Sequence, residues 1–237
     1  MTRDDAQQHR RHLPAREAPP FDLDILYRST HFVAINKPAG LPVHPSRGTA
    51  LSVEAFFPSL SKRKDGPWLV HRLDRDTSGC LLIALRKQAL IAAQNAFSQR
   101  QVTKTYWAIV CGQPAEDAGT LDLPLLRVEK NRLWKMEVNP EGQDSHTNWR
   151  VLYRGCGATL LELQLLTGRT HQARAHCAAM GHPIIGDPIY GATSGDAELL
   201  LHCRALRLNC NGEDISVTAP PGDAMADWIK AVPGDGF

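Results

Sequence analysis

The sequence lacks any apolar run near the roughly 18 residues that a membrane-spanning helix needs. It also lacks an apolar signal core near its N-terminus. Its six cysteines form no Cys-x-x-Cys pair, and three of them lie in apolar runs. We therefore expect reduced cysteines in the core of a cytoplasmic protein that has no membrane partner.

Common cofactor and metal motifs are missing as well. There is no Gly-x-Gly-x-x-Gly, no Gly-Lys-Ser/Thr phosphate loop and no His-Glu-x-x-His. His171, His176, Cys177 and His182 are close in sequence, but their spacing fits no common zinc pattern. Helical register also puts His171 and His176 on different faces. We expect neither a metal nor a cofactor.

Net charge is low, at +2, and the composition is that of an ordinary globular protein, 43% hydrophobic and 22% charged. The charge is unevenly spread, because residues 77–115 and 163–186 contain no Asp or Glu. The basic and histidine residues noted in these stretches are Arg86, Lys87, Arg100, Lys104, Arg169, His171, Arg174, His176 and His182. Such faces can hold phosphates, although solvated helix faces give the same pattern.

The first 20 residues are polar and contain Pro14, Pro19 and Pro20, which predicts a disordered tail. We expect residues 21–237 to form a single domain. Apolar runs and alternation predict strands at 23–28, 31–36, 68–70, 80–85, 104–110, 132–138, 147–153, 159–165, 204–208 and 215–218. Helices are predicted at 51–57, 88–100, 167–180 and 223–232.

One stretch organises the chain, the nine residues His71 to Gly79 (HRLDRDTSG) between two buried strands. One interpretation of this stretch is an ordinary solvated turn whose charges pair with one another. The stretch resembles the signature of the RluA-type RNA pseudouridine synthases, His-Arg-Leu-Asp-x-x-Thr-Ser-Gly. In that family the Asp of the motif, here Asp74, is catalytic.

Further motifs follow in the family's order from about residue 23 to residue 220. They are Asn36–Gly40 with Val43–Pro45, Lys104-x-Tyr106, Asp122-x-Pro124-Leu125, Thr167-Gly168-Arg169-x-His171-Gln172-x-Arg174, Gly181–Asp187 and Leu200–His202. The resemblance implies an α+β fold with a long, mixed, mostly antiparallel sheet, flanking helices and a central cleft. It covers the catalytic domain without the S4-type RNA-binding module of some relatives.

The resemblance implies an isomerisation that needs no cofactor. The N1–C1′ bond of a uridine breaks, the base turns, and C5 bonds to C1′. Asp74 would act on the sugar as an anion, either by covalent attack or by proton abstraction. Arg169 holds the family's position for its partner and would lower the carboxylate pKa by roughly 1–3 units. A phosphate clamp at a helix start is the other interpretation of Arg169.

Other positions receive roles in the same way. The ring of Tyr106 would stack on uracil, and its oxygen would take the C5 proton. Arg72 would fill the gap that a flipped base leaves, and Leu200 and Leu201 would wall the pocket. Asp76 is interpreted as a residue that structures the loop. The further RNA- or substrate-binding positions are His71, Lys104, His171, Gln172 and Arg174.

The implied partner is RNA, a stem-loop of ribosomal or transfer RNA, bound by a monomer without an obligatory protein partner. One alternative is an RNA-binding chaperone on the same fold that has lost catalysis. Another is a glycosidase-like hydrolase that uses Asp74 and Asp76. Both are disfavoured, the first because Asp74, Tyr106 and Arg169 occur together. Which RNA is modified cannot be read from the sequence.

Overall fold

The structure is a computed structural model that describes residues 21–45, 51–130, 133–155, 157–191 and 197–231. The strands are β1 (Asp24–Arg28), β2 (Phe32–Lys37), β3 (Trp68–Leu69), β4 (Ser78–Ala84), β5 (Thr103–Cys111), β6 (Ala118–Asp122), β7 (Leu125–Lys130), β8 (Leu133–Val138), β9 (His146–Gly155), β10 (Ala158–Leu165), β11 (Leu201–Cys210) and β12 (Glu213–Thr218). The helices are a 3-10 helix (Val53–Phe56), α1 (Phe57–Leu60), α2 (Lys87–Ser98), α3 (Gln172–Ala179) and α4 (Asp223–Ala231). The predicted tail lies outside the described residues, and the single domain over 21–237 stays a prediction.

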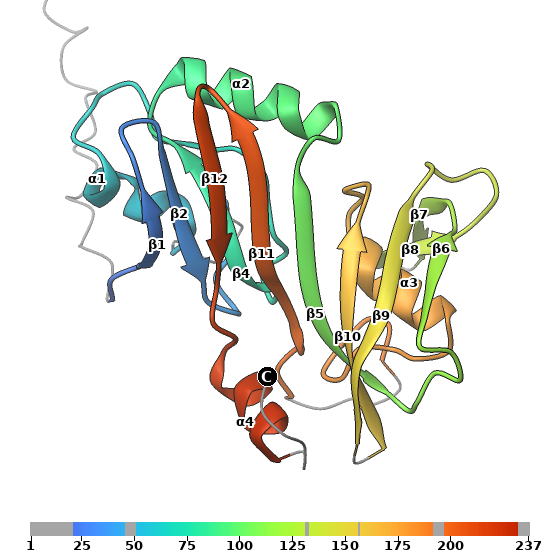
Figure 1. Cartoon of the computed structure of the whole chain (residues 1–237). Helices are drawn as coiled ribbons and strands as arrows, with labels where there is room; N and C mark the ends of the chain where they lie inside the picture. The colour runs from blue at the N-terminus through green and yellow to red at the C-terminus, as the bar shows by residue number, and fades with distance from the viewer. Residues whose placement is uncertain (1–20, 46–50, 131–132, 156, 192–196, 232–237) are drawn as a thin grey trace, which may run out of the picture.

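Ten of the described strands form one mixed sheet, which confirms the expected α+β fold. The strand order is β1-β2-β4-β11-β5-β10-β9-β6, with β12 beside β11 and β3 beside β4. Strands β4 and β11 run parallel, with His202 opposite Ser78, whereas their other pairings are antiparallel. Figure 1 shows β11 and β5 in the middle of the sheet. Within the described ranges no helix is both long and apolar enough to cross a membrane.

The core lies where the central strands meet the helices. Almost every residue of β4 is buried, as expected for a strand covered on both faces. Helix α2 buries Ala89, Ala93 and Ala96, while Leu90 and Phe97 pack against the core cluster. This apolar face packs on the core and agrees with the helix predicted at 88–100.

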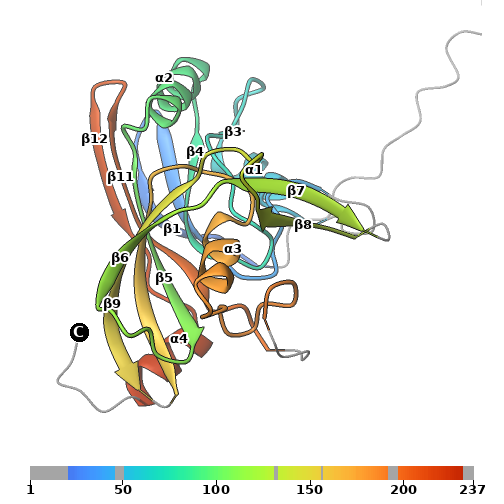
Figure 2. The same ribbon diagram turned by 90° about the vertical axis from the view of Figure 1, so that its right-hand side faces the viewer.

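The consecutive strands predicted at 132–138 and 147–153 do not pair with each other. Strand β8 pairs with β7, a strand that the sequence did not predict, and β9 pairs with β6 and β10. The β7–β8 hairpin extends away from the large sheet, on the same side as α3 (Figure 2). Most residues of the hairpin are partly or fully exposed, with Leu133 at 77%, so no buried face indicates which strand β8 pairs with.

Helix α3 begins at Gln172, five residues after the predicted start at Thr167. The preceding residue, His171, has a φ of 54°, in the left-handed region that interrupts a helix. The Gln172 side chain accepts hydrogen bonds from Thr167 Oγ1 at 2.7 Å and from the Arg169 amide at 3.0 Å. The segment 167–171 is therefore a turn fixed by Gln172 and is not helical.

Candidate active site

The loop between β3 and β4 carries Asp74, and a buried lysine holds it. Lys37 Nζ donates hydrogen bonds to the carbonyl oxygens of Pro38, Leu41 and Arg75, each at 2.8 Å. Burial lowers the pKa of Lys37 to about 7, although the nearby negative charges of Asp76 and Asp74 act to raise it. Three carbonyl acceptors match the three donors of an ammonium group. The loop is thus tied to the turn that follows β2.

Gly79 allows the loop to enter β4 beside β11. Its φ is +108°, and an added Cβ would lie 2.3 Å from the carbonyl oxygen of Cys203. Only glycine fits both the conformation and this close approach. The Thr-Ser-Gly end of the signature therefore reflects the parallel contact between β4 and β11.

Asp74 lies between two cationic or ionisable groups of α3 and its turn. Its Oδ2 is 3.8 Å from Arg174 Nη1 and 3.8 Å from His171 Nε2, and 29% of its side chain is exposed. Arg174 also binds the buried Asp187 through two hydrogen bonds of 2.7 Å. That bidentate pair fixes the guanidinium that faces Asp74.

The structure gives Arg169 a different place from the one expected. Its Nε donates to the carbonyl oxygen of Asp144 at 3.0 Å, and among the described residues the ion-pair partners of Asp74 are His171 and Arg174. The expectation of an Asp74–Arg169 pair is wrong in this conformation. The turn at 167–171 points Arg169 to the pocket wall, whereas Arg174 lies one helical turn further on.

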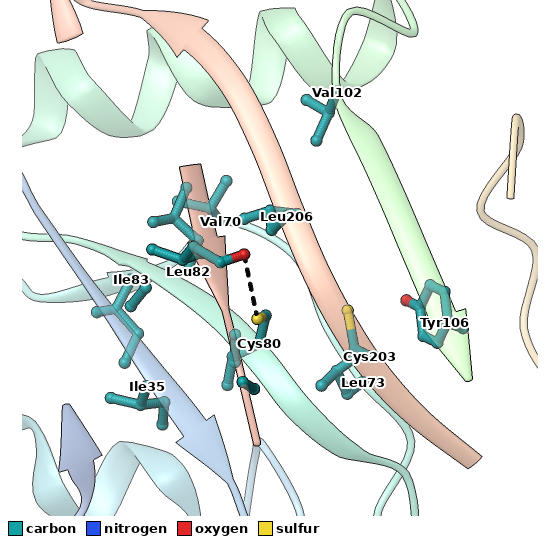
Figure 3. Packing of buried hydrophobic residues seen from close by; sticks show 14 of the residues in the cluster. Ile35, Val70, Leu73, Cys80, Leu82, Ile83, Val102, Tyr106, Cys203 and Leu206 are labelled. Carbon is teal, nitrogen blue, oxygen red and sulfur yellow. Dashed lines mark hydrogen bonds between the residues drawn. The ribbon is translucent and has the colours of Figure 1, made fainter. Parts of the chain in front are cut away.

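Tyr106 of β5 lies on the opposite wall. Its side chain is buried, at 8% exposure, and its hydroxyl points towards the sulfur of Cys203 (Figure 3). Burial and the neighbouring Cys203 raise the pKa of Tyr106 well above its usual value. The phenol therefore stays protonated at neutral pH and presents its ring to the cavity.

Several expected binding residues line a cavity of about 260 Å³ with Asp74 and Tyr106. They are His71, Arg72, Lys104, Arg169, His171, Gln172, Arg174 and Leu201. Leu200 is the exception, because it packs in a second hydrophobic cluster with Ile109 and Met225. The expectation that both leucines wall the pocket is wrong for Leu200, since successive residues of an extended chain point to opposite faces.

The cavity's polar residues divide into supporting and accessible groups. His71 Nε2 accepts the Leu82 amide at 3.0 Å, and burial lowers the pKa of His71 to about 3, so its ring is neutral. Lys104 Nζ donates to the Thr167 carbonyl oxygen at 3.1 Å. Arg72 is exposed and donates to Thr170 Oγ1 at 2.8 Å. Arg72 therefore lies at the solvent-exposed rim of the cavity.

Among the described residues, no group of three or more His, Cys, Asp or Glu side chains could hold a metal ion. The clustered His171, His176 and His182 have other contacts. His176 bonds Ser145, Thr147 and the Leu123 carbonyl oxygen inside the protein. His182 bonds the Cys111 carbonyl oxygen at 2.8 Å.

Comparison with known proteins decides which family has this arrangement. The profile of a family described as RNA pseudouridylate synthase matches residues 31–179. The chain belongs to the RNA pseudouridylate synthase family. An uncharacterized RNA pseudouridine synthase of Zymomonas mobilis is 39% identical over 209 residues, which cover 86% of this chain and 95% of that protein.

Two further relatives agree. Ribosomal large subunit pseudouridine synthase D of Nitrosomonas europaea is 35% identical over 93% of this chain and 65% of that protein. The solved structure of human RNA pseudouridylate synthase domain containing 1 has a TM-score of 0.72 and 33% identity, covering 84% of this chain and 83% of that one. The chain spans between 51% and 95% of the first curated relatives it matches. These likenesses support an RNA pseudouridine synthase, which is an isomerase, with RNA as its substrate.

The sequence patterns did not single out four residues of this pseudouridine synthase site. Lys37 and Asp187 stand inside quoted motifs, and their burial as charged residues is the signal that only the fold reveals. Trp134 and Tyr190, which contact His171, come from segments to which no role was given. Their pattern in the sequence does not distinguish them from ordinary surface aromatics.

Proposed function

We propose that this pseudouridine synthase isomerises particular uridines in structured ribosomal or transfer RNA. The observation that carries the proposal is the placement of Asp74, which is partly exposed in a cavity between Arg174 and the Tyr106 ring. The Arg174 guanidinium, which Asp187 holds, lies 3.8 Å from the Asp74 carboxylate and can orient that group for either covalent attack or sugar-proton abstraction. The opposite aromatic wall is suited to a planar base.

The uridine reaches this cavity by flipping out of the RNA, at a cost of a few kcal/mol. Arg72 at the rim fills the space left in the stack. Asp74 then acts on the sugar while the N1–C1′ bond breaks. The base turns against Tyr106 and Leu201, C5 bonds to C1′, and the C5 proton leaves. In this proposal residues 21–237 act as one catalytic domain in the cytoplasm, as a monomer.

The test compares Asp74→Asn with Asp76→Asn as a matched control. Asp76 is 43% exposed and pairs with Arg75 Nε at 3.6 Å, so its amide variant should keep activity. Ribosomal and transfer RNA from a strain without this gene is incubated with each protein. Carbodiimide-dependent primer-extension stops then report pseudouridine.

The wild type and Asp76→Asn should produce stops at the same uridines. Asp74→Asn should fall below about a hundredth of the wild-type rate, a loss of about 2.7 kcal/mol in transition-state stabilisation. If the wild type binds the RNA but produces no primer-extension stops, the protein would be the catalytically silent RNA chaperone instead. Equal losses in both variants would mean that the isomerisation needs both carboxylates and would contradict the assignment to Asp74 alone.

A further inference from the structure

Tyr190 connects the β7–β8 hairpin to the turn beside Asp74. Its hydroxyl oxygen accepts a hydrogen bond from the Met136 amide of β8 at 2.9 Å. The same oxygen is 3.2 Å from Nδ1 of His171. Nε2, on the far side of that imidazole, is 3.8 Å from Asp74 Oδ2. A chain of contacts therefore runs from the hairpin backbone to the catalytic carboxylate.

The proton count along this chain selects one form of His171. The Tyr190 hydroxyl has one proton to donate. Its oxygen already accepts a hydrogen bond from the Met136 amide, so that proton must go to another acceptor. Within the described residues, the acceptor within reach of the Tyr190 proton is His171 Nδ1. A neutral imidazole whose Nδ1 accepts a proton donor carries its own proton on Nε2. The opposite tautomer would turn the Nε2 lone pair towards the Asp74 carboxylate.

His171 is also held in place as a rigid group. Its backbone has a φ of 54°, an unfavourable conformation for a residue with a side chain. The indole of Trp134 stacks on its ring with centroids 5.0 Å apart and planes 20° apart. The Tyr190 ring meets it edge-on at 5.8 Å. Only 9% of the His171 side chain is exposed, so the imidazole has little freedom to turn.

We propose that Tyr190 is a positioning residue for the isomerisation, because it fixes His171 in the tautomer that points Nε2–H at Asp74. The 3.8 Å separation is longer than a hydrogen bond, so this N–H acts on the carboxylate as an oriented dipole. With the Arg174 guanidinium it keeps Asp74 in place before the uridine arrives. The catalytic consequence rests on the proposed function, whereas the tautomer does not.

The direct test is NMR of the full chain labelled with 15N-histidine. His171 signals are assigned by their loss in His171→Asn, and two-bond couplings identify which ring nitrogen carries the proton. The wild type should carry it on Nε2. Tyr190→Phe keeps the ring over Arg174 but should lose that preference. Tyr27→Phe, which removes a hydroxyl that bonds Glu213 elsewhere, should leave His171 unchanged. A wild-type proton on Nδ1, or an unchanged tautomer in Tyr190→Phe, overturns the proposal.

The functional test follows tritium release from RNA labelled at uridine C5. Tyr190→Phe should lower kcat about tenfold, or about 1.4 kcal/mol, with KM within about twofold of wild type. The deficit relative to wild type should shrink as the pH falls below the ordinary imidazole pKa of about 6.5 and approaches the lowered pKa of His171, because a protonated imidazole carries N–H on both nitrogens. The charged groups that face His171 are Asp74, Arg174, Asp187 and Arg72, and burial lowers its pKa.

A deficit that does not change with pH would indicate a purely structural role and would overturn the positioning role. If the wild type releases no tritium from any of the RNAs, the proposed function fails instead. The NMR result still decides the tautomer in that case.

Discussion

Arg174 serves two carboxylates at once. Nε and Nη2 bind Asp187, while Nη1 faces Asp74. A lysine ammonium is a point charge without this fork, so Arg174→Lys cannot serve both. We expect it to lower single-turnover tritium release at least about tenfold. We also expect it to lower the free energy of unfolding by about 1–3 kcal/mol, measured in urea.

Arg169→Lys is the matched comparison. Arg169 bonds a backbone carbonyl oxygen and lines the cavity, so its exchange should raise KM for RNA and change the rate at saturating RNA little. If Arg169→Lys lowers the rate at saturating RNA more than Arg174→Lys does, Arg169 would be the partner of the Asp74 carboxylate after all.

Tyr106→Phe separates stacking from proton transfer. Phenylalanine keeps the aromatic wall, so RNA binding and bond cleavage should persist. The phenolate is rare because the pKa of Tyr106 is raised, but once formed it is a strong base for the C5 proton. Tritium release should therefore slow about tenfold, or about 1.4 kcal/mol. Release at the wild-type rate would leave Tyr106 with the stacking role alone.

At the scale of elements, His202 joins the parallel strands β4 and β11. Its Nδ1 is 2.9 Å from Ser78 Oγ and its Nε2 is 3.1 Å from the Ala219 carbonyl oxygen, so a neutral ring accepts from one and donates to the other. Burial lowers the pKa of His202 to about 4. At pH values between about 4 and the ordinary pKa of about 6.5, the unfolded chain binds more protons at this residue than the folded protein does. This contribution to stability is complete above pH 6.5 and is lost as pH falls towards 4.

Each such group changes the free energy of unfolding by at most about 1.4 kcal/mol per pH unit. His202→Gln can accept and donate similarly without titrating. The free energy of unfolding of this variant, measured in urea, should therefore fall less than that of the wild type between about pH 6.5 and about pH 4. His44→Gln, at an exposed ring, controls for the exchange itself. Parallel acid losses in wild type and His202→Gln would contradict the assignment.

The elements that the sequence predicted well are those with buried faces. Strands β3 and β4 follow from short apolar runs, and α2 follows from Leu90, Ala93 and Phe97 at helical spacing. Strand β7 and the late start of α3 could not be predicted in this way. The first depends on pairing with an exposed partner strand, and the second depends on the backbone conformation of His171.

At the scale of the whole molecule, the motifs identified the family and most of the cavity. They could not distinguish Arg169 from Arg174 as the neighbour of Asp74, because both stand in one motif five residues apart. That choice depends on the three-dimensional path of the turn between them. Leu200 and Leu201 differ for a similar reason, since adjacent residues point to opposite faces of the sheet.

The position of β11 has a consequence for how the protein is made. This strand lies between β4 and β5, yet it is synthesised long after both. Until residues 201–210 leave the ribosome, both strands present open edges, and Tyr106 lacks the Cys203 neighbour. Open strand edges invite pairing with other chains. A nascent chain that stops before Leu201 should therefore become a substrate for chaperones and proteases, instead of a slower enzyme.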